Sequence, residues 1–264
     1  MNRRLKFSQI KNRIGSANKT LLMLVFLGLL SCGGEEESNE RKTEVDDRLE
    51  ESIALIDSLE ESTLKSLPQV EIPDGYMIIS EDEGDLDGDG INEKVVVFDT
   101  DREVAQGKER ELRIYFNQDG VWSLSHKAIG PVLPSQSGGT MGDPFEKMTV
   151  TGGGIIVNHF GGSVERWSYT HEFRLIDDEW KLAIATLVYF SNCDFTETYT
   201  YNLVKLNGYH SRQKERCDEN GNVTKSKFEV EESLTIKKAS VLMDGFGPGS
   251  TEIEVKGEED YYYL

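Results

Sequence analysis

The stretch that most constrains the fold is a short acidic loop between positions 84 and 98 that leads directly into β-branched residues. Aspartates occupy every second position at its start, a glycine follows, and one more acid closes it before Lys94–Phe98. Ca²⁺ in proteins takes roughly six to eight oxygen ligands, from carboxylates and backbone carbonyls. We therefore expect a structural Ca²⁺ held by the side chains of Asp85, Asp87, Asp89 and Glu93 and by the carbonyl oxygen of Ile91.

The residues after the loop show which element it enters. An EF-hand loop has a bidentate acid at about its twelfth position and continues into a helix. Counted from Asp85, that position is Val96, within a Val-rich run that favours a strand. We therefore expect a loop that enters a β-strand. The alternative is an acidic turn without a metal, in which close carboxylates would repel each other by about 1 kcal/mol per pair in water.

Residues 85–98 resemble the calcium loop of FG-GAP and VCBS-type repeats, which leads into a β-strand. The resemblance implies an ion rather than a particular function. A β-propeller of such repeats needs one copy for each of several blades, and this chain contains a single copy. We therefore expect a mainly β fold of antiparallel, sandwich-like sheets with one N-terminal amphipathic helix, and not a full β-propeller.

The first 31 residues predict a targeting segment. Basic residues and no acid precede the apolar stretch 21–30, which is shorter than the roughly 20 residues that span a bilayer but suits the centre of a signal peptide. The segment leads into Leu29–Gly33, which resembles a bacterial lipobox. The resemblance implies that Cys32 is lipidated and that the protein is attached to a membrane through this lipid.

An acidic cluster lies directly after Cys32, within the segment 32–42. Its position resembles the surface-export signal of lipoproteins from Bacteroidota. This resemblance implies an outer-membrane, lipid-anchored protein that is exposed at the cell surface. In the alternative interpretation the segment is only a soluble tether, and the face of the membrane stays open.

The charge of the chain argues against nucleic acid as a partner. The chain has 29 basic and 48 acidic residues, a net charge of −19. Because the targeting segment holds six of the basic residues, the remainder has 23 against 48, a net charge of −25. Such a surface repels phosphate backbones and anionic headgroups. We expect no nucleic-acid partner, and a protein or glycan ligand that the sequence does not identify.

Residues 43–67 predict one amphipathic helix. Apolar residues at positions 45, 49, 53, 56 and 59 recur on one helical face, and Pro68 ends the pattern. Such a helix serves as a stalk, binds a partner, or lies against its own domain. We favour the last of these interpretations.

Residues 70–240 predict an antiparallel β domain that contains the calcium loop at 85–93. Short stretches of alternating residues are separated by turns rich in Gly, Asn and Asp, which is typical of hairpin-connected strands. Asp119-Gly120 and Asn207-Gly208 each predict a two-residue hairpin turn. Residues 241–264 are an acidic, Gly-rich tail, in which 252–255 form a last strand or belong to a disordered end.

A second resemblance covers roughly residues 75–210. The residues that carry it are Met141–Glu146, His159–Ser163, Trp167 and Trp180. They resemble a family of uncharacterised bacterial lipoproteins that carry one calcium loop upstream. That family has no assigned activity, so the resemblance implies an architecture and no site.

Cys193 and Cys217 remain as a pair once the lipidated cysteine is set aside, in a compartment that permits disulfides. With Asn207-Gly208 as the turn, Cys217 lies opposite Thr198, and Cys193 is about 16 Å further along at the rise of a strand. A disulfide needs Cα atoms within about 7 Å. The pair bonds only if residues 191–196 fold back, so a disulfide and two free thiols both stay open.

No motif of a known enzyme class is present, because the chain has no Gly-x-Ser-x-Gly elbow, Walker loop or Cys-x-x-Cys. We therefore favour a non-enzymatic binding or structural role at the cell envelope. The alternative is an envelope hydrolase or a carbohydrate-handling accessory protein with a site near His159 and in the loop 130–145. A cleft that gathers His159, Asp143 and Arg166 would favour this alternative.

Exposed aromatic residues would favour sugar binding instead. The three tryptophans at 122, 167 and 180 each stand among apolar neighbours. Alternation of this kind favours packing in a core over a flat sugar platform.

Overall fold

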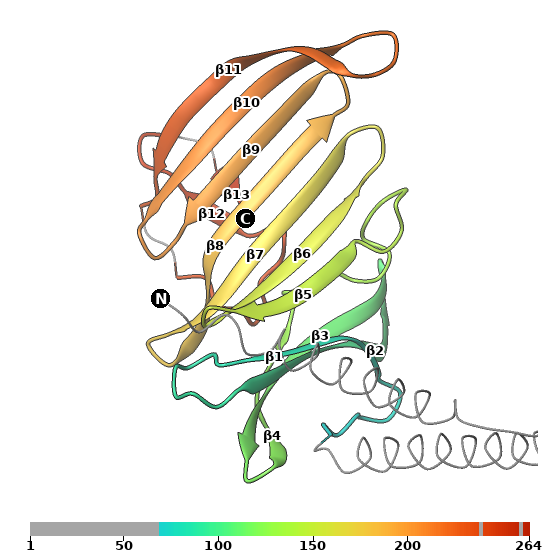
Figure 1. The fold of residues 1–264 in the computed structure, drawn as a ribbon, viewed down its shortest axis with the longest axis vertical. Helices are drawn as coiled ribbons and strands as arrows, with labels where there is room; N and C mark the ends of the chain where they lie inside the picture. The colour runs from blue at the N-terminus through green and yellow to red at the C-terminus, as the bar shows by residue number, and fades with distance from the viewer. Residues whose placement is uncertain (1–68, 238–239, 259–260) are drawn as a thin grey trace, which may run out of the picture. The chain divides into compact units, whose positions relative to one another are not determined.

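The computed structural model describes residues 69–237, 240–258 and 261–264, and these form three antiparallel sheets (Figure 1). The four-stranded sheet has the order β1 (Met77–Gly84), β2 (Glu93–Val104), β3 (Gly107–Gln118) and β4 (Val121–Ile129). The seven-stranded sheet contains, in spatial order from its far edge, β11 (Val223–Thr235), β10 (Asn207–Cys217), β9 (Phe195–Asn202), β8 (Glu179–Ser191), β7 (Arg166–Ile176), β6 (Gly154–Gly162) and β5 (Phe145–Thr151). The small sheet pairs β12 (Glu252–Glu254) with β13 (Tyr261–Tyr263).

The expected fold class is confirmed for this part of the chain. Strands that follow one another in the sequence are neighbours in each sheet, so the two larger sheets are open meanders rather than propeller blades. The signal peptide, Cys32, the tether 32–42 and the helix expected at 43–67 lie outside the described residues. No helix within the described ranges is long and apolar enough to cross a bilayer.

The hairpin between β3 and β4 turns where the sequence predicts it. Gln118 pairs with Val121, which leaves Asp119 and Gly120 as a two-residue loop. Both loop residues have positive φ, 52° and 83°. This is the backbone that the twist of a tight hairpin requires, and Asp-Gly adopts it at low cost.

The expected turn at Asn207-Gly208 is wrong. Asn202 pairs with Asn207, so the turn consists of residues 203–206 and Asn207-Gly208 begins β10. Leu203 determines this position, because its side chain is buried in the core and its N–H donates to the carbonyl of Ala183 at 2.8 Å. The side chain of Asn202 accepts the N–H of Lys205 at 2.8 Å and closes the turn. Burial of a leucine therefore outweighs the local preference of Asn-Gly.

One main core joins the two larger sheets. Val95 and Val97 of β2 pack in the same cluster as Ile155, Val157 and Phe173 of the seven-stranded sheet. The alternate residues of β2 point to the other face of the four-stranded sheet, where Val96 and Phe98 belong to a second cluster. Both faces of β2 are thus buried, which explains its continuous apolar run rather than a polar alternation.

The C-terminal segment is part of the core and not an appended tail. Met243, Phe246 and Leu264 are buried in the main cluster. The ring of Phe246 packs edge-on against Phe173, with ring centroids 5.4 Å apart. The strand expected at 252–255 is present as β12. Because the segment is acidic and rich in glycine, its few and widely spaced apolar residues did not predict a place in the core.

The junction between β1 and β5 places the acidic loop beside the larger sheet. The N–H of Val150 donates to Asp82 Oδ2 at 2.7 Å. A Cβ at Gly84 would lie 2.7 Å from the side chain of Val150, so only glycine fits at this approach. Gly153 in the β5–β6 turn lies against the carbonyl of Leu86. The first residues of the acidic loop are therefore fixed against β5 and the turn that follows it.

Candidate metal centre

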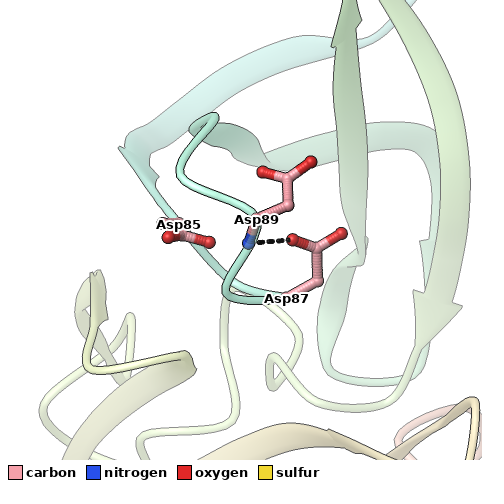
Figure 2. Close-up of side chains that lie close together, drawn as sticks. All are labelled: Asp85, Asp87 and Asp89. Atoms are coloured by element: carbon pink, nitrogen blue, oxygen red, sulfur yellow. Dashed lines mark hydrogen bonds between the residues drawn. The ribbon is translucent and has the colours of Figure 1, made fainter.

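The loop between β1 and β2 brings three of the predicted ligands together (Figure 2). Asp85, Asp87 and Asp89 each offer a carboxylate oxygen, and these oxygens lie within 4.8 Å of one another. Asp85 is half-buried, whereas Asp87 and Asp89 are exposed. One carboxylate of the cluster is therefore partly covered by the protein, and the other two are open to solvent.

The aspartates also shape the loop that carries them. Asp85 accepts the N–H of Gly88 at 2.7 Å and the N–H of Gly90 at 3.0 Å. Asp87 accepts the N–H of Asp89 at 3.0 Å, the interaction drawn as a dashed line in Figure 2. Gly88 and Gly90 have φ values of 87° and 90°, which favour glycine. The alternation of Asp and Gly thus fixes a wrapped backbone with the carboxylates on its concave side.

The fourth acid, Glu93, is the first residue of β2 and is buried. It is only 2% exposed, and its Oε2 accepts the N–H of Leu86 at 2.6 Å. Burial raises the pKa of its carboxyl, the hydrogen bond from Leu86 opposes this change, and the negative charges of the three aspartates raise the pKa further. A buried carboxylate beside three others is unfavourable unless a positive charge neutralises it.

The fifth predicted ligand, the carbonyl of Ile91, lies in the last turn of the loop. The side chain of Ile91 is exposed, and its N–H donates to Asp89 Oδ1 at 2.7 Å. The structure therefore gathers the carboxylates of Asp85, Asp87 and Asp89, whereas Glu93 begins β2 and is not part of that group. The predicted donors are all oxygens, the hard ligands that Ca²⁺ takes. The role of the Ile91 carbonyl stays a prediction.

A second charged cluster, centred on Arg110, fixes the loop 130–145 and was not found by sequence reasoning. Arg110 is 2% exposed and donates from Nε to Asp99 Oδ1 at 2.9 Å. Its two terminal nitrogens donate to the two carboxylate oxygens of Asp143, at 2.7 and 2.5 Å. Such a bidentate pair is strong and directional. The sequence offers one sign of this cluster, an arginine within a strand of buried residues. Many arginines in such strands lie at the surface, so the sign does not identify a buried ion pair.

His159 is buried next to this cluster and makes a structural contact. Its Nε2 accepts the N–H of Leu133 at 3.2 Å, which leaves the proton of the neutral ring on Nδ1. Burial, helped by the positive charge of Arg110, lowers the pKa of His159 to about 4. Arg166 lies three residues further along the sheet, opposite Gly162. The structure therefore joins His159 and Asp143 through Arg110 and the loop, and not through Arg166.

The three tryptophans pack against neighbouring side chains, and two of them are only partly buried. Trp180 is buried in the main core. Trp167 stacks on Tyr169 with ring centroids 4.4 Å apart, and the Nζ of Lys94 lies 5.2 Å above the ring of Trp122. These contacts agree with the packing role that the sequence favours.

Cys193 and Cys217 are joined by a disulfide, with their Cα atoms 5.2 Å apart. The corrected hairpin register explains this pairing. With Asn202 opposite Asn207, the same register continues until Asp194, whose carbonyl accepts the N–H of Glu215 at 2.7 Å. The expected register was wrong by six residues, and this error placed the two cysteines too far apart. The pairing therefore does not need the chain to fold back at residues 191–196.

Comparison with known proteins adds no relative: no family model, no curated protein and no solved structure matches the chain.

Proposed function

We propose that the protein is a lipid-anchored protein of the cell envelope whose loop 85–93 binds a structural Ca²⁺, and that its role is binding or structural rather than enzymatic. The observation that carries the metal proposal is the cluster of three gathered aspartates, whose charges raise the pKa of the buried Glu93 carboxyl. The chain brings four negative charges to one loop, and an ion from solvent would neutralise them.

The ligand set favours Ca²⁺ over other common ions. Every donor is a carboxylate or carbonyl oxygen, whereas Zn²⁺ is generally held by nitrogen or sulfur ligands. Mg²⁺ requires near-ideal octahedral geometry and keeps several waters. A loop that offers several carboxylates, two of them exposed at Asp87 and Asp89, suits the looser coordination of Ca²⁺ better.

A bound ion would stabilise the junction between the two larger sheets. Leu86 is buried in the main core, and Glu93 is the first residue of β2. Gly153 of the β5–β6 turn lies against the Leu86 carbonyl. Fixing the loop would therefore fix the entry to β2 and its contact with the larger sheet, which is a structural rather than a regulatory role.

The anchor is supported by the leader and by Cys32 with its flanking residues. We propose the outer membrane as its location, and the acidic cluster after Cys32 favours the surface face over the periplasmic one. The Cys193–Cys217 disulfide is compatible with an oxidising compartment outside the cytosol. Metabolic labelling with palmitate would test the anchor: label is expected in the native chain and lost in Cys32→Ala. Label that persists in the variant would contradict the assignment.

The metal proposal is tested by thermal unfolding of the purified chain. We expect saturating Ca²⁺ to raise the melting temperature by roughly 5–10 °C, because ligand at about 100 times its Kd adds about 2.7 kcal/mol of stability. Asp87→Ala combined with Asp89→Ala should abolish the shift. A matched control removes two exposed acids elsewhere, Glu146→Ala with Glu219→Ala, and should keep it. An unchanged melting temperature after chelation would reject the metal site.

The rival function, a hydrolase or carbohydrate-handling accessory protein near His159 and loop 130–145, receives no specific support from the contacts. Asp143 is bound by Arg110, and Nε2 of His159 is occupied by the N–H of Leu133. Both groups are engaged in holding the loop to the sheet. We therefore retain the non-enzymatic role, with a protein or glycan as ligand and no nucleic acid.

A further inference from the structure

The outer side of β11 is open over most of its length. β11 is the last strand of the seven-stranded sheet and pairs with β10 on its inner side (Figure 1). At its C-terminal end the N–H of Lys256 donates to the carbonyl of Thr235 at 2.8 Å, and Ile236 bridges to Val255. This contact covers only the end of the strand. Backbone groups between Val223 and Leu234 that point away from β10 have no neighbouring strand among the described residues.

The opposite edge of the same sheet is protected. The N–H of Val150 in β5 donates to Asp82 of β1, and the Val150 side chain packs against Gly84. A strand from another molecule is therefore blocked at β5 by its contact with β1. Along most of β11, no described residue blocks it in this way. Pairing through β11 alone uses the same surface on both molecules, and such an interface closes at two copies.

The side chains of β11 divide into a basic half and an acidic half. Lys225 and Lys227 precede Phe228, and three glutamates follow it at 229, 231 and 232. Phe228 is 51% exposed, which is unusual for so large an apolar side chain near the middle of a strand. Within the described chain, neither lysine takes part in an ion pair. The glutamates contact side chains of β10: Glu229 lies 3.8 Å from Arg212, Glu231 accepts the hydroxyl of Tyr209, and Glu232 lies 2.7 Å from His210.

We propose that β11 pairs in antiparallel orientation with β11 of a second copy of this chain, about a two-fold axis near Phe228. Reversing the strand places the basic half of one copy beside the acidic half of the other. A parallel arrangement would place like charges together, which is destabilising across neighbouring strands. The two Phe228 side chains meet at the axis and remove their apolar surface from water.

Two irregularities limit the length of this pairing. The register between β10 and β11 skips Thr224 and Glu229, which marks β-bulges at these positions. Bulges and charged side chains also protect sheet edges from uncontrolled pairing. The segment Lys225–Phe228 between the bulges runs in unbroken register with β10. An axis near Phe228 sets this segment beside residues 228–231 of the other copy, so the pairing crosses the bulge at Glu229. The dimer is therefore short, reversible and selective, because only a partner with the complementary charge order fits.

Cross-linking through Phe228→Cys in the full chain tests the position of the axis. The two native cysteines of the domain are already bonded to each other. Two copies of Cys at 228 would face each other and form a disulfide-linked dimer on a non-reducing gel. Val223→Cys is the matched control, since it is also exposed but would lie about 33 Å from its symmetry mate at the rise of a strand. Equal cross-linking at both positions, or none at 228, would overturn the proposal.

Charge exchange tests the partner. Lys225→Glu with Lys227→Glu makes β11 wholly acidic, and Glu229→Lys with Glu231→Lys makes it predominantly basic. We expect the native chain to dimerise with rising concentration in analytical ultracentrifugation, and each variant alone to lose at least tenfold in association. An equimolar mixture of the two variants should dimerise again, which also shows that both are folded. If the native chain stays monomeric, or the mixture does not associate, the proposed pairing is wrong and the charges serve only to protect the edge.

Discussion

Two regions of this protein gather carboxylates, and they differ in the source of the neutralising charge. In one, the buried guanidinium of Arg110 binds both the buried Asp99 and the exposed Asp143. In the loop between β1 and β2, Asp85, Asp87 and Asp89 have oxygens within 4.8 Å of one another, and Glu93, which follows the loop, is buried. No described cationic side chain makes a salt bridge with these four acids.

The difference shows that access of solvent to the carboxylates determines which kind of positive charge can neutralise them. Arg110 is almost inaccessible, so an exchangeable ion could not reach its position, and the chain supplies a permanent charge in a rigid fork. Asp87 and Asp89 are exposed, so an ion from solvent can enter and leave. Both clusters hold a loop against a sheet. We expect one to act under all conditions and the other to depend on Ca²⁺.

The largest effect is expected from Arg110→Met. Removing the guanidinium leaves Asp99 buried without a partner, and breaking a buried pair in this way costs about 3–5 kcal/mol. Urea unfolding at neutral pH would measure the loss, which should be the same with and without Ca²⁺.

The control for this variant is Arg102→Ala. Arg102 is exposed and pairs with Glu109 at 3.3 Å. A surface pair of this kind contributes at most about 1 kcal/mol. If both substitutions lower the free energy of unfolding by the same amount, the Arg110 cluster holds the loop 130–145 no more strongly than a surface ion pair would.

The next effect separates the two regions by pH. His159 contacts the loop beside Arg110 and has a folded pKa of about 4, whereas an unperturbed histidine titrates near about 6.5. Between these values the unfolded chain binds the proton and the folded chain does not, so stability falls as pH drops from about 6.5 to about 4. The loss for this one group is roughly 3 kcal/mol.

Chemical denaturation across this pH range would measure the slope. His171 adds to it in the same direction, because burial lowers its pKa to about 3. His159→Gln keeps an acceptor for the Leu133 N–H and should flatten the slope. A slope that remains unchanged in this variant would assign the acid sensitivity to other groups.

The smallest effect is expected from Glu93→Gln, and its sign depends on the ion. Without Ca²⁺, the substitution removes a buried charge that three aspartates repel, and stability should rise by about 1 kcal/mol. With Ca²⁺, it removes a ligand, and the stabilisation by the ion should decrease. Calorimetric melting in chelator and in Ca²⁺ measures both changes.

The conservative partner of that experiment is Glu93→Asp, which keeps the charge but shortens the side chain. This variant should gain no stability in chelator. A variant pair that behaves alike in chelator would show that the charge of Glu93 is not the source of strain between the acids.

Local patterns were sufficient for the strands but not for their register. The Asp119-Gly120 turn follows from its backbone preference, and the structure agrees. Asn207-Gly208 has the same preference and is not the turn, because the buried Leu203 fixes the chain four residues earlier. The position of such a turn depends on which side chains the rest of the sheet buries. A local motif carries no information about that burial.

The same limit explains which site residues were found. The acidic loop is contiguous in sequence, so its ligands could be named in advance. Asp99, Arg110 and Asp143 come from two strands and a distant loop. Each is a common charged residue at an ordinary position, and only the fold reveals that Arg110 joins Asp99 to Asp143.

The C-terminal segment has a consequence for how the protein must be made. Met243, Phe246 and Leu264 fill the core against strands that are synthesised long before them. Until these residues are made, the part of the core that they complete stays open, although the strands of the seven-stranded sheet are already synthesised. Phe173 then lacks the ring of Phe246, which packs edge-on against it. Complete packing of the larger sheet therefore depends on residues 243–264, and a chain cut before Met243 should leave apolar surface exposed.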